Sequence, residues 1–133
     1  MKKVFRITVS IVLVLVLAAG VFLFYLSRGL NQDIELTGID LTDVNDGVYQ
    51  GNYEGGRWTN ELSVTVNDHK ITDIGIVEDI TFSSESITKE LFDRVKGSQN
   101  TQIDTISGAT VTSMAYLKSI ENAVSSNQDG INN

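Results

Sequence analysis

The chain has 133 residues, which accommodates about one domain. With 17 acidic residues against 10 basic ones, its formal net charge is −7, and this acidic balance argues against nucleic acid and anionic lipid surfaces as partners. No cysteine is present, which excludes disulfides, thiolate metal sites and lipidated cysteines. A single histidine, His69, argues against a multi-histidine metal or haem site.

The N-terminal segment is apolar for the length of a membrane span. Residues 7–26 hold no charge, and at ~1.5 Å per residue they just cross a ~30 Å hydrocarbon core. Lys2, Lys3 and Arg6 precede this segment and only Arg28 follows it closely. The positive-inside rule therefore predicts a cytoplasmic N-terminus and an extracytoplasmic remainder, and we expect residues 1–28 to be a single-pass membrane anchor.

A cleaved signal peptide is the alternative interpretation, because small residues follow an apolar run at "LAAG". The apolar run continues through Leu26, well beyond the ~7–15 residues of a usual signal core. This length favours an uncleaved anchor and leaves cleavage as the second interpretation.

The next segment, residues 29–46, is predicted to be an acidic spacer. Residues 31–46 contain five acids and no base, with only scattered aliphatics, a composition typical of solvated, flexible chain. Beyond Arg28 the chain has six basic and 17 acidic residues, a net charge of −11. Sixteen flexible residues have a root-mean-square span of ~20–25 Å, so the spacer is expected to let the following domain, residues 47–125, move above the membrane.

An antiparallel sheet is predicted from three segments. Residues 47–53, "GVYQGNY", favour a strand but contain too many glycines for a central one. Residues 61–67 alternate between apolar and polar side chains, as a half-buried strand does. A hairpin turn follows, with His69 as a turn residue where glycine would be easier, and the return strand over residues 70–77 needs a bulge near Thr72.

Two helices are predicted after the strands. Helical periodicity begins at Ser86, and Gly97 is expected to end this first helix. A second helix is expected with Thr112 or Ser113 as its N-cap, and residues 126–133 are expected to be a disordered tail. Because strands precede helices, the predicted fold class is α+β, a small antiparallel sheet covered by helices and preceded by one transmembrane helix.

The stretch "DTISGATVTS", residues 104–113, gathers five hydroxyl side chains around a glycine and an alanine. The amides of a helix's first turn lack partners and the helix dipole adds positive charge there, so a loop leading into this end suits an anion such as phosphate. Gly108 allows close approach, and Ser107, Thr112 and Ser113 can donate hydrogen bonds to phosphate oxygens. From the residues alone, a phosphate-bearing ligand and a ligand-free helix cap both remain open.

The same stretch resembles the flavinylation signature of the FMN-binding domain family, Asp-x-x-Ser/Thr-Gly-Ala-Ser/Thr. Asp104, Ser107, Gly108, Ala109 and Thr110 match every defined position of that signature. The resemblance extends to "DGVYQGNY", similar to the family's opening strand, and to "LSVTVNDHKITDIGIVE", similar to its central hairpin, with a histidine in place of the customary glycine. It covers about residues 46–124, the whole of the expected domain.

The resemblance implies that FMN is joined covalently, through its phosphate, to the hydroxyl of Thr110. It implies a separate flavin transferase, dependent on FAD and Mg²⁺, that recognises Asp104 and residues 107–109, with Thr112 and Ser113 beside the phosphate. The family includes the flavin-carrying subunits of sodium-pumping NADH:quinone reductase and its ferredoxin-linked relatives, together with small membrane-anchored carriers. One anchor and one domain resemble the last group, which implies an extracytoplasmic electron carrier between a membrane donor and an external acceptor, without a catalytic site of its own.

Five aromatic side chains are candidates for a wall against the flavin ring: Tyr49, Tyr53, Trp58, Phe82 and Tyr116. Trp58 is the first choice because it follows Gly55 and Gly56 on an expected loop, where core packing explains a large ring less easily.

Two other functions stay open. One is a cofactor-free assembly or adhesion domain whose motif is only a helix cap, and the other is a flavoprotein enzyme with its own small-molecule site.

Overall fold

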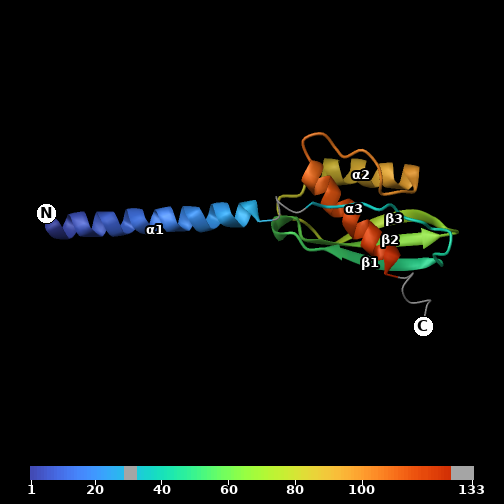
Figure 1. Cartoon of the computed structure of the whole chain (residues 1–133), viewed down its shortest axis with the longest axis horizontal. Helices are drawn as coiled ribbons and strands as arrows, with labels where there is room; N and C mark the ends of the chain where they lie inside the picture. Colours follow the sequence, from blue (N-terminus) through green and yellow to red (C-terminus); the bar gives the residue numbers. More distant parts are fainter. Residues whose placement is uncertain (29–32, 127–133) are drawn as a thin grey trace.

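The first helix, α1, is long and extends away from one end of the domain (Figure 1). The structure, a computed structural model, describes residues 1–28 and 33–126, and α1 spans Lys2–Ser27. None of its residues is buried against the protein, and its mean hydropathy reaches 2.9. Its 26 residues extend about 39 Å, so α1 is long and apolar enough to cross a membrane.

Three antiparallel strands form one sheet in the order β1-β2-β3. The central strand is β2 (Asn60–Asn67), and the edges are β1 (Gly47–Tyr53) and β3 (Lys70–Glu78). Buried and half-buried residues alternate along β2, which confirms the predicted half-buried strand. The glycine-rich strand lies at an edge, as its composition indicated.

The hairpin between β2 and β3 has the predicted turn and the predicted bulge. Asp68 and His69 have φ angles of 50° and 58°, the left-handed conformation that this turn requires. The register shifts between Thr65 and Val66, opposite Thr72. His69 is therefore a turn residue, and the extra residue at Thr72 brings both halves of β3 into line with the core.

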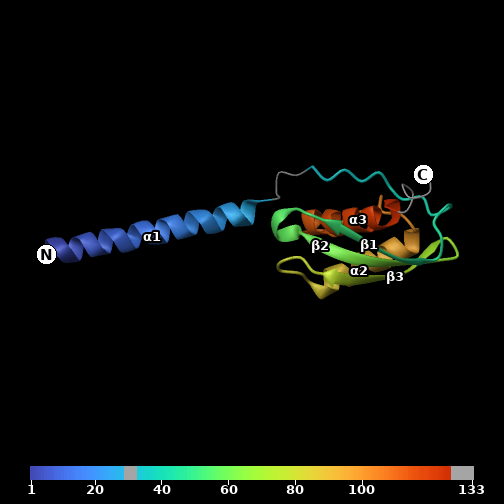
Figure 2. The ribbon, with the colours of Figure 1, turned by 90° about the horizontal axis from the view of Figure 1, so that it is seen from below.

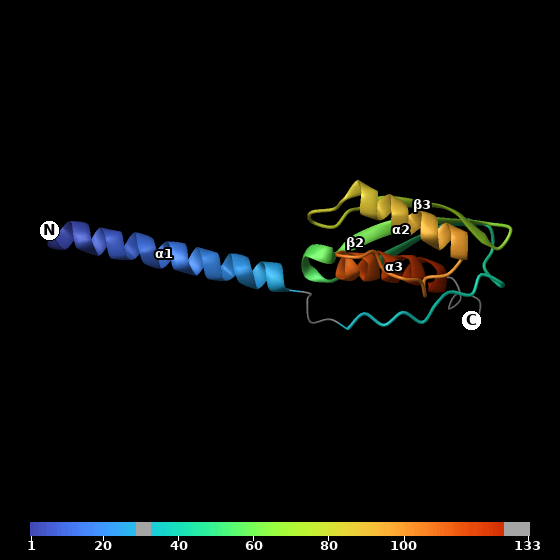
Figure 3. The same ribbon diagram turned by 90° about the horizontal axis from the view of Figure 1, so that it is seen from above.

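Two helices, α2 (Glu85–Ser98) and α3 (Thr110–Ser125), cover one face of the sheet (Figures 1 and 3). α3 crosses β1 and β2, whereas α2 contacts β3. A short 3₁₀ helix, η1 (Gly56–Trp58), connects β1 to β2. One hydrophobic core lies between the helices and the sheet, which is the predicted α+β arrangement.

A glycine on β1 sets how closely α3 packs on the sheet. A Cβ atom placed on Gly51 would lie 2.1 Å from the Ser119 carbonyl oxygen and 2.2 Å from the Ala123 amide nitrogen. Both atoms belong to helix backbone, which cannot move aside as a side chain can. Beside this contact the buried Ser119 hydroxyl donates to Asn60 Oδ1 on β2 at 2.7 Å. Glycine is therefore needed here for close approach of two backbones.

The first domain helix does not end at the predicted glycine. α2 continues through Gly97 to Ser98. Gln99 ends it instead, in a left-handed conformation with a φ of 56°, and its amide donates to the Val95 carbonyl at 2.7 Å. The prediction was wrong because a polar residue can adopt the conformation for which glycine is the usual choice.

Residues 33–46, here called the strap, pack on the domain and do not form the solvated spacer that the composition predicted. The strap runs beside α3 (Figure 2). Its apolar side chains contact the core: Ile34, Leu36, Ile39, Leu41 and Val44. Of these, Leu41 is 8% exposed and Val44 only 1%.

Hydrogen bonds also fix the strap to α3. The Thr37 amide and hydroxyl both donate to Glu121 Oε1, at 2.7 and 3.0 Å. Lys118 Nζ donates to the Glu35 carbonyl at 3.0 Å and pairs with Glu121, which is 2% exposed, at 3.0 Å. The spacer prediction was wrong because it weighed the acids, whereas the aliphatics recur often enough to bury one side of an extended segment.

Candidate functional site

The loop between α2 and α3 ends in a tight turn that leads directly into α3. Ile106 is 8% exposed and anchors the turn in the core, and the Ala109 amide donates to the Ile106 carbonyl at 2.9 Å. Gly108 has a φ of +78°, which glycine adopts without strain. A Cβ atom on Gly108 would meet no atom within 4 Å, so the turn presents open backbone.

The hydroxyl residues of this turn lie in opposite environments. Thr110 is the first residue of α3 and is exposed. Ser113, one turn later, is fully buried, and its Oγ accepts the Ile106 amide hydrogen at 3.1 Å. The predicted N-cap at Thr112 or Ser113 was therefore wrong, because the helix already begins at Thr110 and Ser113 ties the preceding turn to it from the inside.

The first amides of α3 have no partner among residues 1–28 and 33–126. Ala109 is the N-cap residue and supplies no side-chain hydrogen bond. Within the described ranges of the chain the amides of Thr110, Val111 and Thr112 donate no hydrogen bond, whereas the Ser113 amide donates to the Ala109 carbonyl at 2.8 Å. Three free N–H groups and the positive end of the helix dipole thus lie beside the exposed Thr110 hydroxyl, which suits an anion.

The outer side of the turn is held by α2. Asp104 and Ser107 are both exposed. Arg94 Nη1 donates to the Asp104 carbonyl at 3.2 Å, while Arg94 Nη2 donates to Glu90 Oε1 at 2.6 Å. Sequence reasoning missed this support, because a bond to a backbone carbonyl leaves no signal in the pattern of side chains. Asp104 and residues 107–110 thus share one turn, as the signature requires, and half-buried Thr112 follows on α3.

The aromatic candidates are placed differently from what the sequence suggested. Trp58 is 5% exposed, and the Arg57 guanidinium lies 4.1 Å from its ring centroid. The reason for choosing Trp58 was therefore wrong, because the core explains this ring, and its contact with a flavin stays a prediction. Tyr116 is also fully buried, packed edge-on against Phe92 with ring centroids 5.7 Å apart. Phe82, by contrast, is 76% exposed.

A cleft of about 380 Å³ lies between β3 and α2, lined in part by Asp79, Thr88 and Phe92. Tyr116 lies ~9 Å along α3 from Thr110, and its hydroxyl donates to Asp79 Oδ1 at 2.5 Å. Burial raises the pKa of Tyr116 well above its ordinary value, and the bond with Asp79 adds to that shift. The Tyr116 hydroxyl therefore stays protonated, and its hydrogen bond to Asp79 links α3 to the lining of the cleft.

The fold and the turn together define a small α+β domain with an exposed hydroxyl at an anion-binding helix start. The model of the FMN-binding domain family matches residues 56–125, which is more than half of the chain, and the chain belongs to that family. It is also 37% identical over 84 residues to NADH:acrylate oxidoreductase of Vibrio harveyi. That alignment covers 60% of this chain but only 8% of the relative. No solved structure matches.

Family membership confirms the resemblance found in the sequence and gives the chain a flavin-binding role in electron transfer, with FMN as the cofactor. The residues present fit the phosphate of that cofactor. The exposed Thr110 hydroxyl, three amides without partners in the described part of the chain and the open backbone at Gly108 lie on one turn. This arrangement favours a flavin site over a cofactor-free helix cap.

Proposed function

We propose that this chain is a membrane-anchored electron carrier whose FMN is attached through a phosphoester to Thr110 Oγ. The observation that carries the proposal is the exposed hydroxyl on the first residue of α3, beside the free amides described above. Thr110 also occupies the acceptor position of the signature. Ser113 is disfavoured as the acceptor because its hydroxyl is buried and accepts the Ile106 amide.

Attachment needs a partner, which we take to be a flavin transferase that uses FAD and Mg²⁺. The Thr110 oxygen forms a bond to the phosphorus of the FMN half of FAD, and the pyrophosphate bond breaks. AMP leaves with the bridging oxygen, and the hydroxyl proton passes to a base of the transferase. Asp104 and Ser107 are exposed and so accessible for recognition, and the missing side chain at Gly108 leaves the backbone open to the enzyme.

The residues around Thr110 divide into two roles. The amides of residues 110–112 hold the negative charge of the phosphate, helped by the helix dipole. Ser113 and Arg94 act indirectly, because each fixes the backbone of the turn. Bound FMN supplies the redox chemistry, and the chain supplies its position. We assign the chain a carrier role and no catalytic site of its own, because the sequence has no second cofactor motif and no paired acid and base.

The membrane topology of the carrier follows from its charges. Lys2, Lys3 and Arg6 precede the apolar part of α1, and Arg28 follows it, so we place the N-terminus in the cytoplasm and the domain outside. On this side of the membrane Thr110 would hold FMN where it could accept electrons from a donor in the membrane and pass them to an external acceptor. A covalent bond suits this location, because a cofactor held only by contacts would be lost to dilute surroundings.

Attachment is tested by co-expression with a flavin transferase. The wild-type chain should gain one FMN-sized mass and remain fluorescent in a denaturing gel, whereas Thr110→Ala should do neither. Thr110→Ser should retain the flavin, because the hydroxyl is the reacting group. Thr112→Ala is the matched control on the same turn and should also be flavinylated. Flavin found on Thr112 or Ser113 in the wild-type chain would contradict the proposed acceptor.

The topology is tested by adding protease to intact spheroplasts. The domain should be degraded while α1 remains in the membrane, because the charges place the domain outside. Disruption of the membrane should cause no further loss of the domain. A domain that resists protease until the membrane is broken would place it in the cytoplasm and refute the extracytoplasmic role.

A further inference from the structure

The connection between α1 and the domain is short. Because the strap packs on the domain from Ile34 onward, only residues 28–33 join it to α1, and the seven peptide units from Ser27 to Ile34 span at most ~25 Å. The Arg28 carbonyl oxygen lies beside η1, 2.4 Å from where a Cβ atom on Gly56 would be. One end of the domain is thus held next to the end of α1 (Figure 1), and this end is here called the anchor end.

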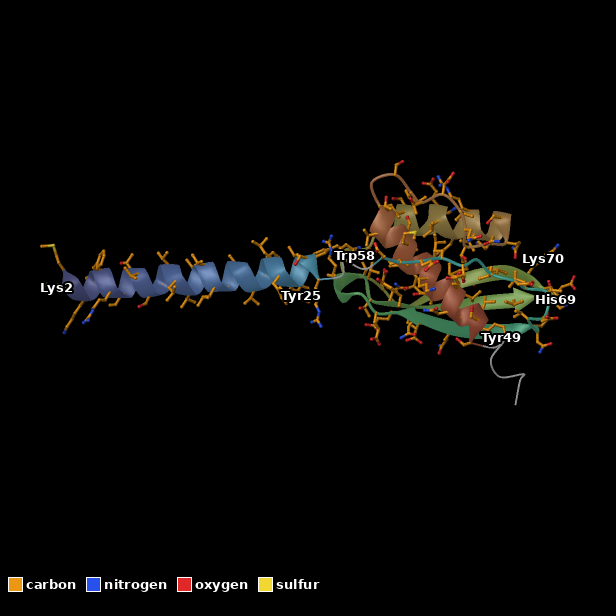
Figure 4. All side chains as sticks on the ribbon, in the orientation of Figure 1. Lys2, Tyr25, Tyr49, Trp58, His69 and Lys70 are labelled. Carbon is orange, nitrogen blue, oxygen red and sulfur yellow. The ribbon has the colours of Figure 1, made fainter. Side chains whose placement is uncertain are left out.

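The anchor end contains η1 and the loop of residues 79–84. The Thr81 amide donates to the Arg57 carbonyl in η1 at 2.9 Å, which fixes the loop to η1. Figure 4 shows Trp58 of η1 next to α1, with His69 and Lys70 at the opposite end of the domain.

The start of α3 also lies at the anchor end. α3 contacts η1, and Tyr116 in its second turn bonds to Asp79 at the beginning of the 79–84 loop. Figures 1 and 3 show α3 starting on the side of the domain nearest α1. The exposed Thr110 hydroxyl is therefore on the side of the domain that faces the anchor.

Phe82 projects from this end in a strained conformation. It is 76% exposed, and its φ of +65° is one that bulky residues rarely adopt. Ile76 and Val77, near the end of β3, are 42% and 52% exposed. Within residues 33–126 these three and Val48 are the large apolar side chains with high exposure. Three of the four thus gather at or directly before the 79–84 loop.

We propose that residues 79–84 rest on the bilayer that α1 crosses, with Phe82 in the headgroup region, so that the Thr110 end of the domain faces the membrane. The bilayer is the occupant because the same chain continues into it within ~25 Å. Aromatic side chains favour the membrane–water interface. Because the domain is acidic, the contact is apolar in origin and is expected with neutral lipid. The inference rests on the membrane anchoring proposed above.

The consequence concerns the route of electrons. In this orientation Thr110 would hold a flavin where it could exchange electrons with a partner lying in the plane of the membrane. The strap, being packed, does not provide the long flexible tether on which a swinging carrier depends. The proposal holds on whichever side of the membrane the domain lies.

The test uses the full chain, which has no cysteine, so a single introduced cysteine can be labelled with an environment-sensitive fluorophore. Ser83→Cys reports on the loop while keeping Phe82, and Lys70→Cys, exposed at the opposite end, is the matched control. Each labelled chain is reconstituted without flavin into phosphatidylcholine vesicles that contain a headgroup-proximal spin-labelled lipid as quencher. We expect several-fold stronger quenching at position 83 than at position 70, and a large loss of that quenching when Phe82→Ser is added.

Equal, weak quenching at positions 83 and 70 would overturn the proposal. Protection of position 83 that appears only with a co-reconstituted membrane protein, or only after flavinylation, would also overturn it and assign Phe82 to a protein partner or to the flavin ring. Flotation of the vesicles tests the anchor separately. A chain that fails to float refutes the proposed membrane anchoring, whereas one that floats without quenching at position 83 refutes this inference alone.

Discussion

The two ends of α3 have opposite surroundings. From Ala115 to Val124 most residues are buried against the sheet and the strap, and Glu121 is 2% exposed. At the other end Thr110 is exposed, and the first three amides have no partner in the described part of the chain. The attachment site that we propose must be reachable by a modifying enzyme, and it must also be held in place. This helix meets both needs by separating them along its length.

Replacing Glu121, in the buried C-terminal part of α3, should have the largest effect on the free energy of unfolding. Glu121→Ala leaves Lys118 and the Thr37 amide without their partner and should lower the free energy of unfolding by about 3 kcal/mol. Urea titration of the full chain in detergent micelles, followed by the emission of the single tryptophan, Trp58, measures the loss. Glu90→Ala, which removes an exposed pair with Arg94, is the control and should cost less than about 1 kcal/mol. Equal losses would mean that the strap is not held as described.

Adding a side chain at Gly51 should push the buried C-terminal part of α3 away from the sheet. Gly51→Ala places a methyl group against helix backbone and should cost about 1–3 kcal/mol or more by the same urea titration. Gly97→Ala is the matched control, because a side chain there meets no atom within 4 Å and the site is inside α2. It should stabilise the domain by about 0.5–1 kcal/mol. A stabilising Gly51→Ala would contradict the close packing of α3.

Two substitutions that each remove one hydroxyl test the difference between buried Ser113 and exposed Thr110, which lie within one turn of α3. Ser113→Ala leaves the Ile106 amide without its acceptor in a buried place and should cost about 1–2 kcal/mol. Thr110→Ala removes an exposed hydroxyl and should change stability by less than about 0.5 kcal/mol, although we expect it to abolish flavin attachment. Stability and flavin content measured on the same two preparations separate the roles. A destabilised Thr110→Ala would show that Thr110 is also structural.

The smallest expected effect is a dependence on alkaline pH. The raised pKa of Tyr116 means that the unfolded phenol ionises first as the pH rises, so the folded state loses stability above the ordinary value of ~10. Between pH 9 and pH 10.5 the wild-type chain should lose about 0.8 kcal/mol more stability than Tyr116→Phe. Burial also raises the pKa of Tyr53, but that contribution is the same in both chains. Equal slopes of the free energy of unfolding against pH in the wild-type chain and in Tyr116→Phe would refute the assignment of this pH dependence to Tyr116.

Local patterns in the sequence predicted the sheet and the exposed turn that carries the signature. The alternation of apolar and polar side chains predicted β2. The tolerance of histidine for a left-handed backbone predicted His69 as a turn residue. The break in the alternation of the next strand predicted the bulge at Thr72. The signature predicted that Asp104 and residues 107–110 lie close together, because seven successive positions contain them all and local backbone sets their geometry. Each of these features depends on residues only a few positions apart.

Features that depend on distant partners were missed or misread. The strap was taken for a solvated spacer because its partner, Glu121, is 84 residues away from Thr37. Trp58 was placed on a loop because nothing near it shows the core that covers it. Ser113 was expected to cap the helix or to donate to a phosphate, whereas its buried hydroxyl accepts a hydrogen bond from the Ile106 amide. Local chemistry allowed several partners for each of these groups, and only the folded chain selects among them.

The bond between Thr37 and Glu121 has a consequence for the order in which the chain is made. Synthesis delivers the anchor and the strap first and α3 last, so the strap has no surface to pack on until α3 has emerged. Closing contacts across 84 residues is slow compared with forming a hairpin. The sheet can therefore assemble early, but the strap packs and completes the core only after α3 has been made. Until then the signature turn is a peptide without the support of the folded domain, and Thr110 gains its place at the start of a helix only when α3 packs.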